Sequence, residues 1–197
     1  SSDGSITKLE AYKPISSGIE REGKKEFYGG SDLSALFLSP EGNLIAVENT
    51  YASWYEGEGN PMDPAFNDWE GYKSKNGYFL RILDKSGAEI SSTEIELSEN
   101  EYISAYNAKM DQDGNILVSA DMSLRAYSQH GDLVCEIPCD YYIDNIVNMP
   151  DGSIAVMAWN EGKEVLMPVD LGAGSFGEPV DVPNDAWNMF ASGGDYD

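Results

Sequence analysis

The sequence predicts an all-β protein built from repeated antiparallel sheets. The first observation is a glycine turn of the form acid-Gly-polar between short apolar runs, found at Glu41-Gly42-Asn43, Asp113-Gly114-Asn115 and Asp151-Gly152-Ser153. A second glycine series, Gly87, Gly131 and Gly174, alternates with the first at steps of 44 and 43 residues. Such turns favour tight hairpins, and a period of about 40 to 45 residues is typical of a four-stranded propeller blade.

Reading outward from these turns assigns four strands to each blade. The strands are expected at 33–39, 44–49, 78–83 and 89–97, at 104–110, 116–120, 124–128 and 133–137, and at 143–149, 154–159, 164–169 and 178–182. A fourth blade begins at Ala186 and is cut short. Because propellers typically close with about four to eight blades, we expect a partial β-propeller, three blades plus the start of a fourth, from a longer protein.

The domain organisation follows from the same turns. Residues 1–32 are expected to be an N-terminal leader with a candidate ring-closing strand at 6–12, and residues 33–197 to hold the blades. The first blade contains a surplus, residues 50–77, which predicts a long insertion between its second and third strands. Loops of this length inside a compact repeat are usually functional or disordered, and the aromatic residues of this one favour a function.

Composition narrows the classes of partner. The chain has 35 acidic and 12 basic residues and a formal net charge of -23, which disfavours nucleic acid and anionic lipid as partners. No apolar run approaches the roughly 20 residues of a membrane span. Cys135 and Cys139 lie four residues apart without a nearby histidine, so they make a poor metal site. Buried thiols are favoured there, with a disulfide as the alternative.

Three patterns in the sequence bear on catalytic or metal sites. Asp111-Gln112-Asp113-Gly114-Asn115 matches the first half of a calcium loop, but the apolar strand that follows favours a hairpin turn. His130 sits in a turn, which predicts solvent exposure and not a catalytic role. The many acidic residues offer pairs for glycoside hydrolysis, yet their abundance singles out none of them. The sequence predicts no catalytic residue, cofactor or metal.

Aromatic residues provide the candidate binding surface. Flat rings beside carboxylates and amides suit a sugar ligand, since rings stack on its apolar face and polar groups hold its hydroxyls. The same residues suit docking of a protein partner, and packing between blades is the structural alternative for those at blade entries. The insertion contributes the first five candidates and the blade entries the rest: Trp54, Tyr55, Phe66, Trp69 and Tyr72, then Tyr102, Tyr142, Asp144 and Trp187.

The segments Tyr142-Ile143-Asp144, Met149 to Val156, Asn184-Asp185-Ala186-Trp187 and Gly193-Gly194-Asp195-Tyr196-Asp197 resemble the N-terminal propeller region of extracellular solute-binding lipoproteins, the ABC-transporter substrate-binding proteins of gut Firmicutes. The resemblance covers about residues 33–197 and rests on propeller turns. It implies an extracellular or cell-surface location, a lipid tether in the parent protein, and capture of a solute or glycan. It assigns no functional residue.

The preferred function is therefore a non-catalytic extracellular binding module for a small solute, a glycan or a protein partner, without insertion into a membrane. One alternative is a propeller-type glycosidase or lyase that uses acidic residues such as Glu101 or Asp144. A purely structural or protein-interaction propeller is the other.

Overall fold

The computed structural model describes residues 8–61, 69–98, 103–104, 107–120 and 122–182. Within these ranges the chain is an all-β protein made of antiparallel sheets without an α-helix, as the sequence predicts. None of the described segments forms a helix of the length and apolar character that a membrane span requires. The chain divides into two compact units, Ser1–Glu96 and Leu97–Asp197.

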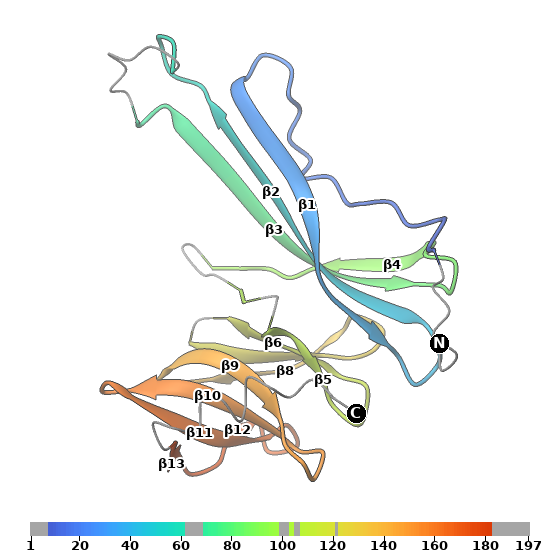
Figure 1. Cartoon of the computed structure of the whole chain (residues 1–197), viewed down its shortest axis with the longest axis vertical. Helices are drawn as coiled ribbons and strands as arrows, with labels where there is room; N and C mark the ends of the chain where they lie inside the picture. The colour runs from blue at the N-terminus through green and yellow to red at the C-terminus, as the bar shows by residue number, and fades with distance from the viewer. Residues whose placement is uncertain (1–7, 62–68, 99–102, 105–106, 121, 183–197) are drawn as a thin grey trace. The chain divides into compact units, whose positions relative to one another are not determined.

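The first unit contains one four-stranded meander in the order β1-β2-β3-β4 (Figure 1). Its strands are β1 (Lys25–Leu38), β2 (Leu44–Tyr55), β3 (Tyr72–Leu83) and β4 (Glu89–Glu94). Two predicted glycine turns connect them, with Gly42 at a φ of 85° and Gly87 at 89°. Both angles lie in the left-handed region, which glycine adopts without the steric cost that a Cβ imposes.

The strands β1, β2 and β3 extend beyond the bounds that the sequence predicts. The insertion expected at 50–77 is mostly strand, because β2 runs to Tyr55 and pairs with β3 from Tyr72 onward in unbroken register. The leader expected at 1–32 already contains the start of β1 at Lys25, which pairs with the far end of β2. The threonine and three aromatic residues of 50–55 suit a strand, and β1 supplies a third strand that makes the pairing cooperative.

The segment before β1 is a strap and not a strand over residues 8–12, while the rest of the expected 6–12 strand lies outside the described residues. The amide of Ala11 donates to the carbonyl of Ser86 in the β3–β4 turn. A Cβ at Gly87 would lie 2.9 Å from the Leu9 Cβ, so the strap packs directly on this turn. Residues 8–12, which were expected to form a strand, therefore pack against the first sheet instead.

A buried ion pair fixes the strap to the sheet. The Arg81 guanidinium lies 2.7 Å from Glu48 Oε1 and also binds Glu89 and the carbonyl of Lys13. The Tyr12 hydroxyl donates to the same Glu48 oxygen at 3.0 Å, and the Arg81 guanidinium lies over the Tyr12 ring. Burial would lower the pKa of Arg81, but Glu48 and Glu89 raise it above its ordinary value.

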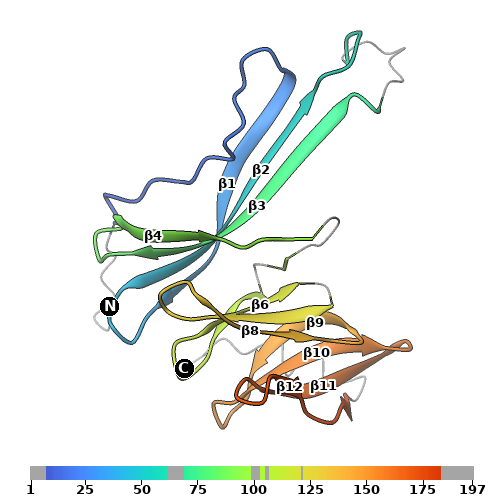
Figure 2. The same ribbon diagram turned by 180° about the vertical axis from the view of Figure 1, so that it is seen from behind.

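The second unit contains two meanders, one in the order β5-β6-β7-β8 and one in the order β9-β10-β11 with β12 and β13 both pairing to β11. Figure 2 shows the two sheets from behind. Their strands are β5 (Lys109–Met110), β6 (Ile116–Ala120), β7 (Ser123–Tyr127) and β8 (Leu133–Pro138), then β9 (Tyr142–Asn148), β10 (Ile154–Asn160), β11 (Lys163–Asp170), β12 (Ser175–Phe176) and β13 (Val180–Asp181).

The strands closest to the predicted positions are those bounded by glycine turns, and the edge strands differ most. Of the described residues in the expected strand 104–110, only Lys109 and Met110 form a strand, β5, and an isolated bridge joins Ile103 to Ala120 just before it. The expected strand 178–182 is reduced to β13, and the separate two-residue strand β12 precedes it. Edge strands pair on one side only, so less of their length is held in register.

The two sheets of the second unit share one hydrophobic core. Leu117, Leu124 and Ile137 from the first sheet pack against Ile143 and Val156 from the second, and all five are buried. Each fully buried Leu or Ile side chain contributes about 1.5 to 3 kcal/mol relative to exposure. The Asn107 amide adds a polar tie by donating to the Asp144 carbonyl at 2.8 Å. Consecutive repeats therefore stack face to face in this unit.

Two of the weighed motifs are turns in the structure. Asp111 Oδ1 accepts from the amides of Asp113 and Asn115, and β6 follows directly, so this is the predicted hairpin turn. His130 is exposed in the β7–β8 turn, as predicted. Cys135 and Cys139 are free thiols, with Cys139 buried in the shared core. Burial raises the pKa of both thiols, which disfavours the reactive thiolate.

Candidate functional site

The strands β1, β2 and β3 continue past β4 as a three-stranded ribbon. β4 pairs only with Phe79–Leu83, whereas β2 and β3 remain paired from Thr50 and Gly77 out to Tyr55 and Tyr72. Figures 1 and 2 show these three strands running on together where β4 has ended. We call this part, formed by residues 25–30, 50–55 and 72–77, the ribbon. It is the structural form of the predicted insertion.

Four predicted binding residues gather at the end of the ribbon. Tyr55 and Tyr72 are directly opposite in the β2–β3 register, with ring centroids 5.3 Å apart. Trp69 stacks on Tyr72 at 5.9 Å with an angle of 22° between the ring planes. Trp54 belongs to the same end but, as the neighbour of Tyr55 on one strand, it points to the opposite face. The face that carries Tyr55, Tyr72 and Trp69 is called the aromatic face.

The four residues differ in their exposure to solvent. This difference distinguishes residues that support the cluster from the residue that can contact a ligand. Tyr55 is 1% exposed and its hydroxyl donates to the Glu58 carbonyl. Trp54 is 9% exposed, and its indole N–H donates to Glu56 at 2.6 Å. Trp69 is 71% exposed and, while stacked on Tyr72, presents ring surface to solvent. Trp54 and Tyr55 are therefore supports, and Trp69 is the side chain placed to contact a ligand.

Polar and charged groups hold the aromatic face in position. The Tyr72 hydroxyl donates to Glu26 Oε2 at 2.6 Å, and this hydrogen bond is the main cause of the raised pKa of Tyr72. Lys25 lies over the Tyr55 ring and donates to the carbonyls of Gly57 and Gly59. A flat aromatic surface next to a carboxylate and an ammonium group can bind a ligand that has both an apolar face and hydroxyls.

The ribbon also carries two aromatic residues that sequence reasoning did not single out. Tyr28 on β1 and Tyr51 on β2 are stacked, with centroids 5.5 Å apart and an angle of 28° between the planes. The alternation Tyr51, Ser53, Tyr55 is a period of two and would have placed these side chains on one strand face. Treating 50–77 as a loop concealed that signal.

The remaining predicted site residues are not part of this cluster. Tyr142 and Asp144 lie on β9 in the second unit, where Tyr142 is 48% exposed and does not pack between sheets. Phe66, Tyr102 and Trp187, together with the alternative catalytic residue Glu101, lie outside the described residues. The structure thus brings together Trp54, Tyr55, Trp69 and Tyr72 of the nine candidates.

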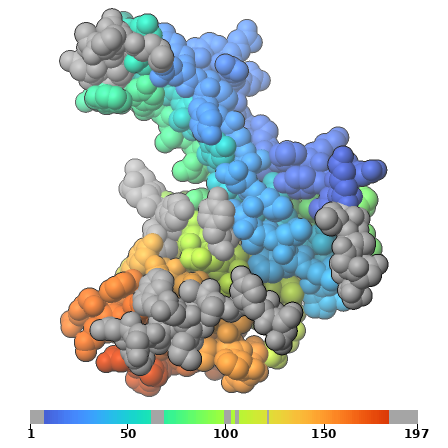
Figure 3. Space-filling model, viewed as in Figure 1, coloured from blue at the N-terminus to red at the C-terminus, as the bar shows by residue number. Residues whose placement is uncertain are grey.

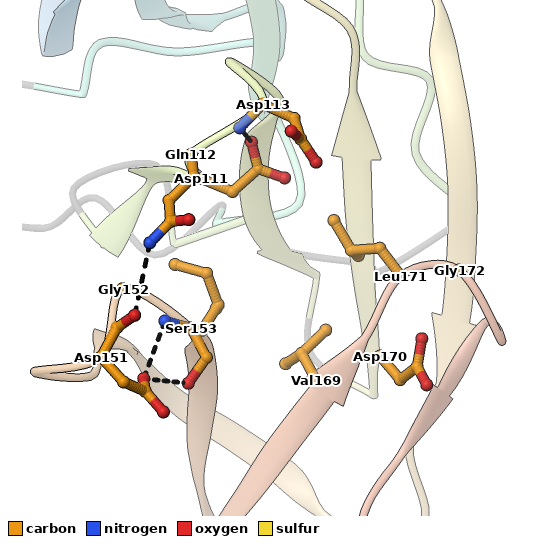
Figure 4. A pocket seen from close by; sticks show the side chains of 11 residues that line it. Asp111, Gln112, Asp113, Asp151, Gly152, Ser153, Val169, Asp170, Leu171 and Gly172 are labelled. Carbon is orange, nitrogen blue, oxygen red and sulfur yellow. Dashed lines mark hydrogen bonds between the residues drawn. The ribbon is translucent and has the colours of Figure 1, made fainter.

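A concave feature lies among the turns of the second unit (Figure 4). This cavity of about 510 Å³ is lined by the β5–β6, β9–β10 and β11–β12 turns, and its residues include Asp111, Asp113, Asp151 and Asp170 over an apolar floor. Asp111, Asp151 and Asp170 already cap their own turns by accepting backbone N–H groups. In the described ranges no three acidic, His or Cys side chains are grouped to hold a metal ion. Asp111, Asp151 and Asp170 therefore stabilise the turns in which they lie.

Comparison with known proteins leaves the family open. No family model matches the chain, and no curated protein matches it. A solved structure of similar shape is that of a protein of unknown function from Bacteroides caccae, determined at 1.35 Å resolution. It shares 13% sequence identity over 77% of this chain, with a TM-score of 0.44. The chain spans 47% of that protein, or about half its length.

Proposed function

We propose that this chain is a non-catalytic binding module and that the aromatic face of the ribbon binds a sugar. The observation that carries the proposal is the stack of exposed Trp69 on Tyr72, which is itself backed by buried Tyr55. An exposed tryptophan held by a second ring loses little side-chain entropy when a ligand binds. Such a surface is pre-organised for stacking against the apolar face of a sugar ring.

Polar groups around the stack supply the second requirement of sugar binding. Glu26 lies within hydrogen-bonding distance of Tyr72, and exposed Ser74 shares the Tyr72 face two residues along β3. A carboxylate can accept hydrogen bonds from sugar hydroxyls, and a hydroxyl group can both donate to them and accept from them. Because ring stacking and directional hydrogen bonds act together, the face is better suited to a glycan or polar solute than to a purely apolar ligand.

The proposal includes the wider context of the module. The sheets are proposed to be propeller blades, which the period of about 40 to 45 residues and the face-to-face packing within the second unit support. The location outside the cell and the role in solute or glycan capture by a lipid-tethered binding protein rest on the resemblance of the turn sequences. A protein partner docking on Trp69 is the competing reading of the same surface.

Binding to defined sugars tests the proposal. The chain is assayed by calorimetry and by affinity electrophoresis against xylan, cellulose derivatives, mannan and pectin. Trp69→Ala is expected to weaken binding of the retained polysaccharide about five- to thirtyfold, which corresponds to roughly 1 to 2 kcal/mol for an aromatic contact. The matched control is Trp159→Ala, which removes a tryptophan that is 44% exposed on β10 of the second unit.

Each outcome bears on the proposal. Loss of binding in Trp69→Ala with wild-type binding in Trp159→Ala supports the ribbon as the sugar site. Binding that is unchanged in Trp69→Ala, or the absence of binding to every polysaccharide, refutes it. Circular dichroism of both variants checks that the sheets are intact, which is expected because both indoles are exposed.

A further inference from the structure

We infer that the aromatic face carries a second ring platform, formed by Tyr28 and Tyr51, and that its ligand is an extended glycan chain which spans both platforms. The inference rests on the proposed function, since it names the class of ligand for the same surface. A monosaccharide or other small solute would cover one platform only. The argument depends on three features of the ribbon: a shared face, a built second platform and a polar stretch between the two.

The two platforms lie on one face of the ribbon. β2 pairs with β3 without a register shift from Leu44 to Tyr55, so Tyr51, Ser53 and Tyr55 all point to the same side. On β1, Tyr28 is opposite Ser53 in the register and therefore shares that side. Tyr51 and Tyr55 are four residues apart, which separates them by about 13 Å along the strand. Figure 3 shows the strands of the ribbon in space-filling form, with β1 in blue.

The second platform is held in place by the backbone beneath it. A Cβ at Gly30 would lie 2.9 Å from the Tyr51 hydroxyl and 3.2 Å from the adjoining ring carbon, so the Tyr51 ring lies flat across Gly30. This position brings the ring to Tyr28, which stacks on it at 5.5 Å. Tyr28 is 66% exposed, close to the value for Trp69, so each platform presents one exposed ring backed by a second.

Polar side chains lie beside the platforms on the same face. Ser53 and Ser74 are directly opposite each other, between the positions of Tyr51 and Tyr55, and Asn76 is opposite Tyr51. Ser74 and Asn76 are exposed, and neither has a bulky side chain that would interrupt the surface. Hydroxyl and amide groups at this position can bind the hydroxyls of sugar rings that lie between the two stacked ends.

This arrangement selects a class of glycan. Two platforms on a straight strand require a ligand whose successive rings also lie in a line, as in β-1,4-linked glucose or xylose chains. A helical chain such as α-1,4-linked glucose would bend away from one platform. When one platform is occupied, the second contact becomes intramolecular, so affinity is expected to rise steeply once the chain is long enough to reach both.

The test uses three kinds of probe. Glucose and xylose are the monosaccharides, cellohexaose and xylohexaose are the extended chains, and maltohexaose is the bent chain. The wild-type chain is expected to bind one of the extended hexaoses at least tenfold more tightly than its monosaccharide and more tightly than maltohexaose. Tyr28→Ala is expected to weaken hexaose binding by roughly three- to tenfold and to leave monosaccharide binding unchanged. Tyr28→Phe keeps the ring and is expected to bind as the wild type does.

A positioning variant separates ring loss from ring placement. Gly30→Ala leaves both tyrosines present but displaces the Tyr51 ring, so it is expected to lower hexaose affinity as Tyr28→Ala does. If Trp69→Ala abolishes hexaose binding while Tyr28→Ala and Gly30→Ala bind as the wild type does, the second platform is overturned and the sugar site at Trp69 stands. Hexaose affinity equal to that of the monosaccharide also overturns it. If no sugar binds, the proposed function fails, and this inference fails with it.

Discussion

Replacement of Tyr12 by Phe is expected to destabilise the first unit in a way that depends on pH. The Tyr12 hydroxyl donates to Glu48 Oε1 at 3.0 Å, and Glu48 is fully buried beside Arg81. A hydrogen bond to a charged group contributes about 1.5 to 3 kcal/mol. Since Tyr12 is itself only half-buried, the expected cost of Tyr12→Phe is about 1 to 2 kcal/mol at neutral pH.

The pH dependence follows from the phenol. Burial first, and then the hydrogen bond to Glu48, raise the pKa of Tyr12 from 10.0 to about 12. Because the folded state holds this proton more tightly than the unfolded state, the stabilisation is fully present below pH 10. It is lost as the pH rises from 10 toward 12, by at most about 1.4 kcal/mol per pH unit. The wild type and Tyr12→Phe should therefore converge in stability over that window.

Urea unfolding followed by tryptophan fluorescence measures the difference at pH 8, 9, 10, 11 and 11.5. Other tyrosines and lysines titrate in both proteins, so the difference between wild type and variant isolates Tyr12. Tyr142→Phe removes a hydroxyl from an exposed tyrosine in the second unit and is the control, with an expected change within about 0.5 kcal/mol. A wild-type advantage over Tyr12→Phe that stays constant from pH 8 to 11.5 would refute the reasoning.

Two further substitutions test the packing of each unit. Arg81→Met leaves the Glu48 carboxylate buried without its ion pair and is expected to lower the free energy of unfolding by about 3 to 5 kcal/mol, whereas adding Glu48→Leu should recover most of that loss in urea unfolding. Gly152→Ala at a φ of 83° is expected to cost the roughly 1 to 2 kcal/mol of left-handed strain and little more, because the Gln112 amide that its Cβ would meet is the end of an exposed, flexible side chain and can move aside. The cost is expected to be the same within about 0.5 kcal/mol in a Gln112→Ala background, so a clearly smaller cost there would contradict this account.

The second unit shows which structural features local sequence patterns predict. Each predicted glycine turn at Gly114, Gly131, Gly152 and Gly174 has a positive φ between 64° and 91°. Apolar runs between these turns became strands β6, β7, β10 and β11, because turn chemistry and strand propensity act over only a few residues. The boundaries failed where pairing is one-sided, at β5 and at β13, both of which are shorter than expected.

The candidate site was predictable in its composition but not in its form. Trp54, Tyr55, Trp69 and Tyr72 were identified as a set, yet the segment that holds them was expected to be a loop. Its strands exist because β1 begins early and pairs with the far end of β2, which is a contact between segments about 25 residues apart in the chain. Local patterns cannot report such pairing, and so the shared face with Tyr28 was missed.

The sequence by itself determined the all-β class, the repeated hairpin turns and the apolar strands of the core, since each of these follows from neighbouring residues. Tertiary structure alone decided which faces those strands share. It placed Glu48 and Arg81 together under Tyr12, separated exposed Trp69 from buried Tyr55, and aligned Tyr28 with Tyr51 over Gly30. The physical reason is that burial and cross-strand contact depend on register, and register is set by the pairing of distant segments.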